Sequence, residues 1–128
     1  MILLDTSALL WLLTRDRRMG SAAQSQLAES GTSVHFSAVS IVEMTIKVMI
    51  GKLDLIELAT ESTRRAGLRE LAFTAVHAEG LASFPDLVRH DLFDRMLLAQ
   101  ARVEGMQLLT SDRILLAAAP TLTIDARA

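Results

Sequence analysis

The sequence contains no cysteine, which excludes disulfide bonds, thiolate metal sites and cysteine nucleophiles. A chain without cysteine suits a reducing compartment such as the cytosol. Aromatic residues are also scarce, with four phenylalanines, one tryptophan and no tyrosine. Because 51% of the 128 residues are hydrophobic, aliphatic side chains must build the core. We expect a single domain over residues 1–128, since this length is enough for one core.

The chain also lacks an excess of basic charge, and its net charge is −2. Nucleic-acid-binding domains usually carry a basic excess, so any such contact must come from local patches. Two basic clusters exist, each of which is more commonly a solvated surface than a binding site: Arg15, Arg17 and Arg18, and Arg64, Arg65 and Arg69.

No apolar run is long enough to span a membrane. The run from Ile2 to Leu13 has no preceding basic region and contains Asp5, unlike a secretory signal peptide. We therefore expect a cytoplasmic protein with no membrane association.

Short apolar runs alternate with helical patterns along the whole chain. We expect strands at 2–4, 34–36, 72–75 and 107–110, and an edge strand at 122–124. Helices are expected at 6–13, 20–30, 38–50, 57–71, 77–82, 91–104 and 113–118. This alternation predicts an α/β fold, with a central parallel sheet of four to five strands and helices on both faces.

Four acidic residues from distant parts of the chain are expected at the carboxyl edge of this sheet, where such folds bind ligands. Asp5 follows the first strand, and Asp112 follows the strand at 107–110. Glu43 lies in the second turn of a helix capped by Ser37, where its side chain leans back toward the edge. Asp94 lies near the start of the helix that leads into the strand at 107–110.

Each acid also has an ordinary structural interpretation. Asp5 and Asp112 could be helix N-caps, and Glu43 could form a capping box with Ser40. The negative charge of Asp94 could interact favourably with a helix dipole. However, Asp5 and Glu43 both lie in apolar segments, where a charge needs a partner or a metal ion.

Clustered carboxylates repel one another, so a shared site requires a cation. Oxygen ligands without cysteine select a hard ion, Mg²⁺ or Mn²⁺, which can hold a phosphate oxygen and activate water. We expect Asp5 and Asp94 to bind the metal directly and Asp112 to bind it directly or through water. Glu43 would bind the metal or orient the attacking water. Three hydroxyls are placed to hydrogen-bond these carboxylates, those of Thr6, Ser7 and Thr110.

Four segments, taken in order, resemble the motifs of a PIN domain. They are Leu3–Trp11 (LLDTSALLW), Ser37–Glu43 (SAVSIVE), His90–Ala101 (HDLFDRMLLAQA) and Leu108–Asp112 (LLTSD). Each motif alone is weak, but their order and spacing over the whole chain resemble the VapC-type toxins of bacterial toxin–antitoxin pairs. The resemblance implies a three-layer α/β/α PIN-like fold and Mg²⁺-dependent cleavage of RNA. It also implies a cognate antitoxin and a homodimer, with Asp5, Glu43, Asp94 and Asp112 at the family's acidic positions.

One motif departs from the family pattern, which commonly reads H-x-D-P-F-D-R. Here Leu92 stands where proline is usual, and Asp91 directly follows His90. The roles of both residues are therefore open: His90 would contact RNA or would be a surface or packing histidine. Arg95 would clamp the scissile phosphate or would simply lie on the helix surface. The other two histidines are expected to be structural.

Two other functions compete with the ribonuclease. A receiver-type phosphoacceptor domain has a similar length, but it needs an acidic pair after the first strand, where this chain has Thr6 and Ser7. A non-catalytic PIN-like module that binds RNA or a protein is the second alternative. Five apolar residues could form a dimer or antitoxin surface or belong to the core: Trp11, Leu12, Leu13, Met44 and Met49.

Overall fold

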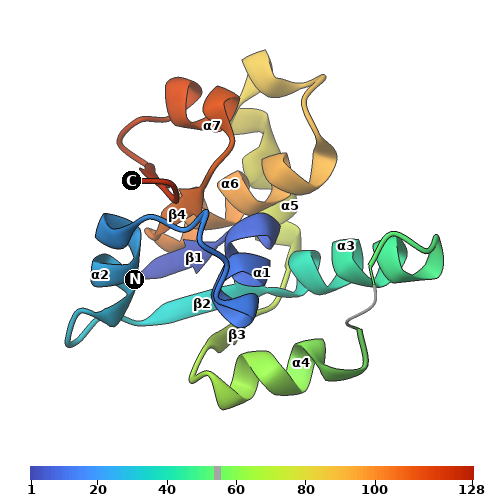
Figure 1. The fold of residues 1–128 in the computed structure, drawn as a ribbon. Coiled ribbons are helices and arrows are strands. Elements are labelled where there is room, and N and C mark those ends of the chain that lie inside the picture. Colours follow the sequence, from blue (N-terminus) through green and yellow to red (C-terminus); the bar gives the residue numbers. More distant parts are fainter. Residues whose placement is uncertain (54–55) are drawn as a thin grey trace.

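A five-stranded parallel sheet forms the middle of the molecule, in a computed structural model that describes residues 1–53 and 56–128. The strand order is β3-β2-β1-β4-β5. The strands are β1 (Ile2–Leu4), β2 (Val34–Ser37), β3 (Arg69–Leu71), β4 (Gln107–Thr110) and β5 (Thr123–Asp125). The predicted parallel sheet is therefore confirmed, and β1 lies at its centre between β2 and β4 (Figure 1).

Helices cover both faces of the sheet, which gives the predicted three-layer α/β/α fold (Figure 1). Side chains of β1 alternate between two hydrophobic clusters: Ile2 and Leu4 pack toward α1 and α2, whereas Leu3 packs toward α6. The helices are α1 (Thr6–Thr14), α2 (Ser21–Ala28), α3 (Ala38–Met49), α4 (Ile56–Arg65), α5 (Ala75–Glu79), α6 (Leu92–Glu104) and α7 (Arg113–Ala118). Two short 3₁₀ helices, Gly80–Ser83 and Pro85–Leu87, connect α5 to α6.

Polar residues begin the helices that matter for the site, three of them at or just after the end of a strand. Asp5 caps α1 directly after β1, and Ser37 caps α3 directly after β2. Asp91 caps α6, and Asp112 caps α7 two residues after β4. Each cap accepts a hydrogen bond from a backbone N–H group that has no partner inside the helix. The carboxyl edge of the sheet is thus lined by helix starts.

The third strand differs from the prediction. β3 is Arg69–Leu71, not 72–75, and α4 ends at Arg65 instead of continuing to 71. Gly67 has a φ of +79°, a left-handed conformation that stops the helix. Arg69 then pairs with His35 of β2, so an edge strand forms from largely exposed residues with no apolar pattern. The segment 72–75, expected as a strand, contains Thr74, which caps α5. α5 therefore begins at Ala75, two residues before the start of the helix expected at 77–82.

Within the described residues, every helix is too short or too polar to cross a membrane.

Candidate metal centre

Asp5 is a buried carboxylate held at both oxygens. Its side chain caps α1, with Oδ1 accepting a hydrogen bond from the Ala8 N–H at 2.7 Å. Oδ2 accepts a hydrogen bond from the Thr110 hydroxyl at 2.6 Å. Burial raises the pKa of Asp5, and the charges of Glu43 and Asp112 raise it further, while the two hydrogen bonds oppose this. The residue is only 4% exposed, so its charge is costly unless a cation is near.

Asp112 lies across from Asp5 and is paired with a histidine. Its Oδ1 accepts hydrogen bonds from the Ile114 and Leu115 N–H groups at the start of α7. Its Oδ2 is 2.8 Å from Nε2 of His90. Burial alone would raise the pKa of Asp112, but hydrogen bonds from Leu115 and His90 outweigh it and lower the pKa. The pKa of Asp112 is therefore lowered, whereas burial raises the pKa of Asp5.

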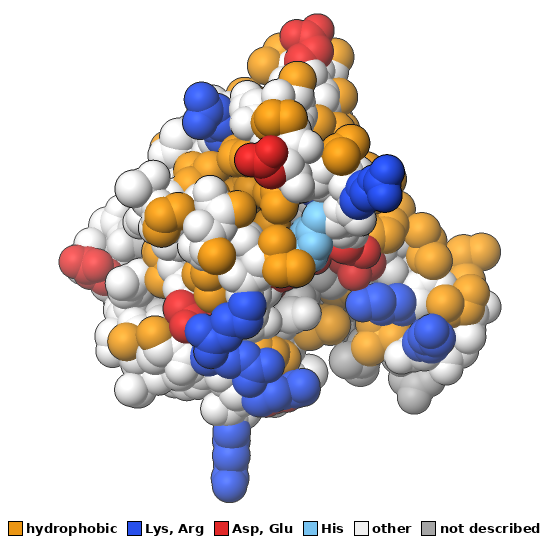
Figure 2. Space-filling view, turned by 90° about the horizontal axis from the view of Figure 1, so that it is seen from above, with side chains coloured by type: hydrophobic (Ala, Val, Ile, Leu, Met, Phe, Trp, Pro, Cys, Tyr) orange, Lys and Arg blue, Asp and Glu red, His pale blue; other side chains and the backbone are white. Residues whose placement is uncertain are grey.

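Asp94, in the first turn of α6, also has a raised pKa. Its pKa is raised from 3.8 to about 7, first by burial and then by the charges of Asp91, Asp5, Asp112 and Glu43. This ranking shows that all four predicted acids are near enough to repel one another. His90, Asp94 and Asp112 each offer a ligand atom, and those three atoms lie within 4.8 Å of one another. Figure 2 shows a histidine beside acidic side chains on one face, with basic side chains at separate places around them.

Glu43 lies on α3, which begins directly after β2 and continues past the carboxyl end of that strand (Figure 1). Its Oε2 is 3.1 Å from Nζ of Lys47 on the next turn. Its Oε1 is buried and has no hydrogen-bond partner. Since Ser37 caps α3, the alternative capping box between Glu43 and Ser40 is not formed; Ser40 Oγ instead accepts a hydrogen bond from Thr6.

The three predicted hydroxyls have different positions. Thr110 contacts Asp5 as described, and its Oγ1 also accepts a hydrogen bond from the Asp112 N–H at 3.0 Å. The prediction that Thr6 contacts a carboxylate is wrong, because its hydroxyl points across to α3 and donates to Ser40. Ser7 lies exposed on the outer side of α1. One hydroxyl of the three therefore orients the acids.

The two residues considered for RNA contact have different positions. His90 lies beside the acids: it touches Asp112 and lies 3.7 Å from Asp94 Oδ2. Its spacing of four residues before Asp94 was visible in the sequence, whereas its contact with Asp112 had no sequence signal. Arg95 donates a hydrogen bond from Nε to the carbonyl oxygen of His90, which fixes the backbone at that point.

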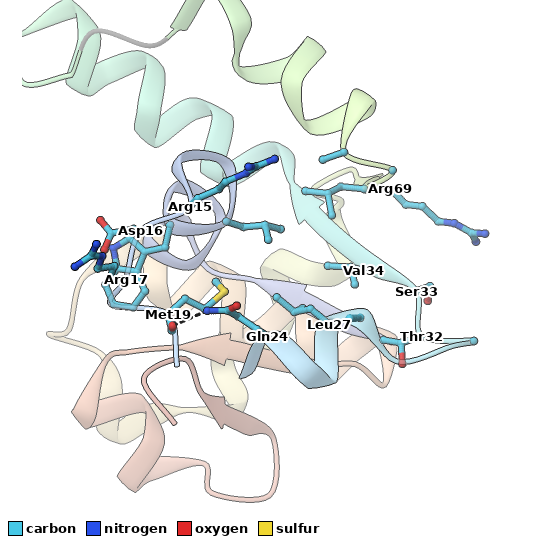
Figure 3. A pocket seen from close by; sticks show the side chains of 17 residues that line it. Arg15, Asp16, Arg17, Met19, Gln24, Leu27, Thr32, Ser33, Val34 and Arg69 are labelled. Carbon is cyan, nitrogen blue, oxygen red and sulfur yellow. Dashed lines mark hydrogen bonds between the residues drawn. The ribbon is translucent and has the colours of Figure 1, made fainter. Parts of the chain in front are cut away.

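The two basic clusters lie away from the acids. Arg18 pairs with Asp16 at 2.7 Å and stacks over the Trp11 ring, and Arg64 pairs with Glu70 at 3.6 Å. Other members line a groove of about 880 Å³ at the amino ends of β2 and β3 (Figure 3). The groove is lined in part by Arg15, Arg17, Leu27, Val34 and Arg69. The basic clusters are therefore not next to the acidic group.

The apolar residues considered for a partner surface divide between core and surface. Trp11 and Met44 are 6% and 1% exposed and belong to the core, so they cannot form such a surface. Met49 is 79% exposed. It continues an exposed apolar stripe along α3 that also contains Val42, Ile46 and Ile50. A stripe of this kind is the sort of surface that partner proteins cover.

The acidic group fits a hard divalent cation by its donor chemistry. Asp94 and Asp112 offer carboxylate oxygens and His90 an imidazole nitrogen within 4.8 Å of one another, and Asp5 and Glu43 lie near enough to raise the pKa of Asp94. The buried, unpartnered Oε1 of Glu43 is an acceptor that a cation or its bound water would satisfy. A bound cation would also offset the repulsion that raises the pKa of Asp94.

Several solved structures share this fold. VapBC2 from Rickettsia felis, solved bound to a DNA fragment from its promoter, has a TM-score of 0.71 at 14% identity, with 97% of this chain and 98% of that chain covered. A toxin–antitoxin complex from Klebsiella pneumoniae has a TM-score of 0.64 at 18% identity, with 98% of each chain covered. FitAcB from Neisseria gonorrhoeae has a TM-score of 0.65 at 20% identity, also with 98% of each chain covered. The TM-scores establish a common fold, and at identities below 25% the likeness extends to the fold alone.

The sequence comparisons identify the family. A search of curated proteins finds no match. A family model for the PIN domain matches residues 2–120, nearly the whole chain. This match overturns the receiver-domain alternative, and the motifs that resemble a PIN domain lie inside the matched range. The chain belongs to the PIN domain family.

Proposed function

We propose that this PIN domain is a Mg²⁺- or Mn²⁺-dependent ribonuclease. The placement of Asp5, Glu43, Asp94 and Asp112 in one region carries the proposal: burial, together with the charges of Asp91 and the other three acids, raises the pKa of Asp94 to about 7. Such a group is a cost to the fold unless it serves a function that needs concentrated negative charge. Binding a divalent cation is the function that uses it.

Each acid has a distinct role in this proposal. Asp5, Asp94 and Asp112 hold the metal, and Glu43 either binds it or orients water through its unpartnered Oε1. When bound, the metal would polarise the scissile phosphate and make its water a better nucleophile.

The surrounding residues hold these acids in place. The Thr110 hydroxyl and the Ala8 N–H fix both oxygens of Asp5, so its carboxylate cannot rotate freely. The N–H groups at the start of α7 fix Asp112 in the same manner. His90 lies next to Asp112 and Asp94 and would be the nearest basic group to a phosphate of the RNA held at the metal. Pre-oriented groups of this kind reduce the reorganisation needed during the reaction.

We further propose that the protein is the toxin of a toxin–antitoxin pair that acts on RNA in the cytoplasm. One structural relative, the toxin–antitoxin complex from Klebsiella pneumoniae, supports this proposal together with the resemblance of the motifs to VapC-type toxins. The exposed apolar stripe along α3 supports contact with another protein. Its occupants would be a cognate antitoxin, which would neutralise the enzyme, or a second copy in a homodimer.

Cleavage of a labelled single-stranded RNA by the purified protein tests the proposal. We expect cleavage with Mn²⁺, none in EDTA, and none by Asp5→Asn even with Mn²⁺. Asp86→Asn is the matched control, because it makes the same chemical change at an exposed residue and should cleave like wild type. If wild-type protein binds RNA without cutting it, the non-catalytic PIN-like module is the correct interpretation.

A further inference from the structure

A buried chain of polar contacts joins the two helices that carry Glu43 and Asp94. Gln100 of α6 and Ser37, the cap of α3, are both fully buried. The Ser37 hydroxyl donates a hydrogen bond to Oε1 of Gln100, although the two residues are 63 positions apart in sequence. Buried polar groups of this kind are costly unless every donor and acceptor is satisfied.

The bonds around Gln100 fix the direction of its amide. Its Nε2 lies 3.3 Å from the Ala72 carbonyl oxygen, which can only accept a hydrogen bond, so the nitrogen must face it. Oε1 therefore faces Ser37, which must donate. The Ser37 oxygen at the same time accepts from the Val39 N–H as the cap of α3. One hydroxyl thus begins α3 and ties it to α6.

A second buried contact holds α3 on its other side. The Thr6 hydroxyl donates to Ser40 Oγ at 3.0 Å, and both residues are almost completely buried. Thr6 directly follows Asp5, while Ser40 lies one turn before Glu43. The start of α3 is therefore fixed to α6 on one side and to α1 on the other.

We propose that Gln100 is a positioning residue for the metal centre: through Ser37 it sets the place of α3, and hence of Glu43, relative to Asp94. The inference rests on the proposed metal site. Gln100 lies six residues after Asp94 on α6, and Glu43 lies six residues after Ser37 on α3. A change at Gln100 should therefore shift α3 relative to α6, and so move Glu43 relative to Asp94, although Gln100 contacts neither acid.

Calorimetric titration with Mn²⁺ alone, together with melting in EDTA, tests this role. We expect Gln100→Leu to weaken Mn²⁺ binding about tenfold, the size of effect seen when groups that orient metal ligands are removed. Thr123→Val is the matched control, since it removes a buried hydroxyl that donates to the Ala119 carbonyl far from the acids. It should lower the melting temperature but keep Mn²⁺ affinity within about twofold.

Variants at Ser37 keep the test decisive even if Gln100→Leu does not fold. Ser37→Gly remains an acceptable helix cap but has no hydroxyl for Gln100, so it should also weaken Mn²⁺ binding. Ser37→Thr keeps the hydroxyl and should restore the affinity. If Ser37→Gly binds Mn²⁺ like wild type, and Gln100→Leu does the same where it folds, Gln100 has only a packing role and the inference is wrong. If wild-type protein itself binds no Mn²⁺, the proposed function fails and the inference falls with it.

Discussion

Replacing Asp94 by asparagine should stabilise the metal-free protein at alkaline pH. The pKa of Asp94 rises from 3.8 to about 7 on folding, so the folded state holds a proton that the unfolded state releases. The free energy of unfolding therefore falls as the pH rises from about 4 to about 7, and it stays at this lower value at higher pH. The difference between the two pKa values corresponds to about 4 kcal/mol at most, because solvent screens the charge of this partly exposed carboxyl.

The substitution also removes a favourable interaction of Asp94 with the helix dipole, but this loss of stability is smaller than the gain. Asp94 lies in the first turn of α6, where a negative charge favours the helix dipole by about 0.3–1 kcal/mol. The removal of repulsion should therefore dominate at pH 8, and Asp94→Asn should melt higher than wild type by on the order of 10 °C. At pH 4 the wild-type carboxyl is protonated in the folded state, so the two proteins should melt within a few degrees of each other.

Differential scanning calorimetry in EDTA at pH 4 and pH 8 measures this difference directly. Addition of Mn²⁺ at pH 8 should raise the melting temperature of wild type but not that of Asp94→Asn, because the ion binds the folded state through this acid. Asp86→Asn, an exposed aspartate, should behave like wild type in every condition. A variant that is not stabilised at pH 8 would refute the claim that repulsion among buried acids raises the pKa of Asp94.

Three further predictions concern contacts near and away from the acids. Thr110→Val removes the hydroxyl that donates to Asp5, and urea denaturation should show a loss of about 1–3 kcal/mol that Thr110→Ser largely restores. Gly20→Ala should lower the melting temperature, because its Cβ would lie 1.9 Å from the carbonyl oxygen of the last residue. His90→Ala should raise the pKa of Asp112, measured from the pH dependence of its carboxyl carbon in NMR spectra.

Each of these predictions has a clear contrary result. Equal stability of Thr110→Val and wild type in urea would show that the hydroxyl does not contribute to holding Asp5. An unchanged melting temperature for Gly20→Ala would show that the C-terminal residues move aside without cost. An Asp112 pKa that is the same in His90→Ala would mean that helix N–H groups alone account for its low value.

Most of the fold could be predicted from the sequence because its central elements have strong local signals. The apolar runs of β1 and β4 are buried on both faces, and the helices beside them begin at good N-caps such as Asp5 and Ser37. β3 could not be found in this way. It is a largely exposed edge strand whose position depends on pairing with β2, which is a tertiary interaction.

The acids of the candidate centre could be selected from the sequence, since parallel strands bring their carboxyl ends to one edge. The contacts between the acids and their neighbours could not be selected in this way. The hydrogen bond between His90 and Asp112 spans 22 positions, and the bond between Ser37 and Gln100 spans 63. Such pairs depend on the packing of α6 against its neighbours, which no local pattern encodes.

A crystal grown with Mn²⁺ would test the central claim most directly, through the anomalous scattering of the bound ion. The account predicts an anomalous peak enclosed by the carboxylates of Asp5, Glu43, Asp94 and Asp112, and its disappearance in Asp5→Asn crystals grown under the same conditions. An empty centre in wild-type crystals, or a peak that persists unchanged in Asp5→Asn, would contradict the assignment of these four acids to one metal site.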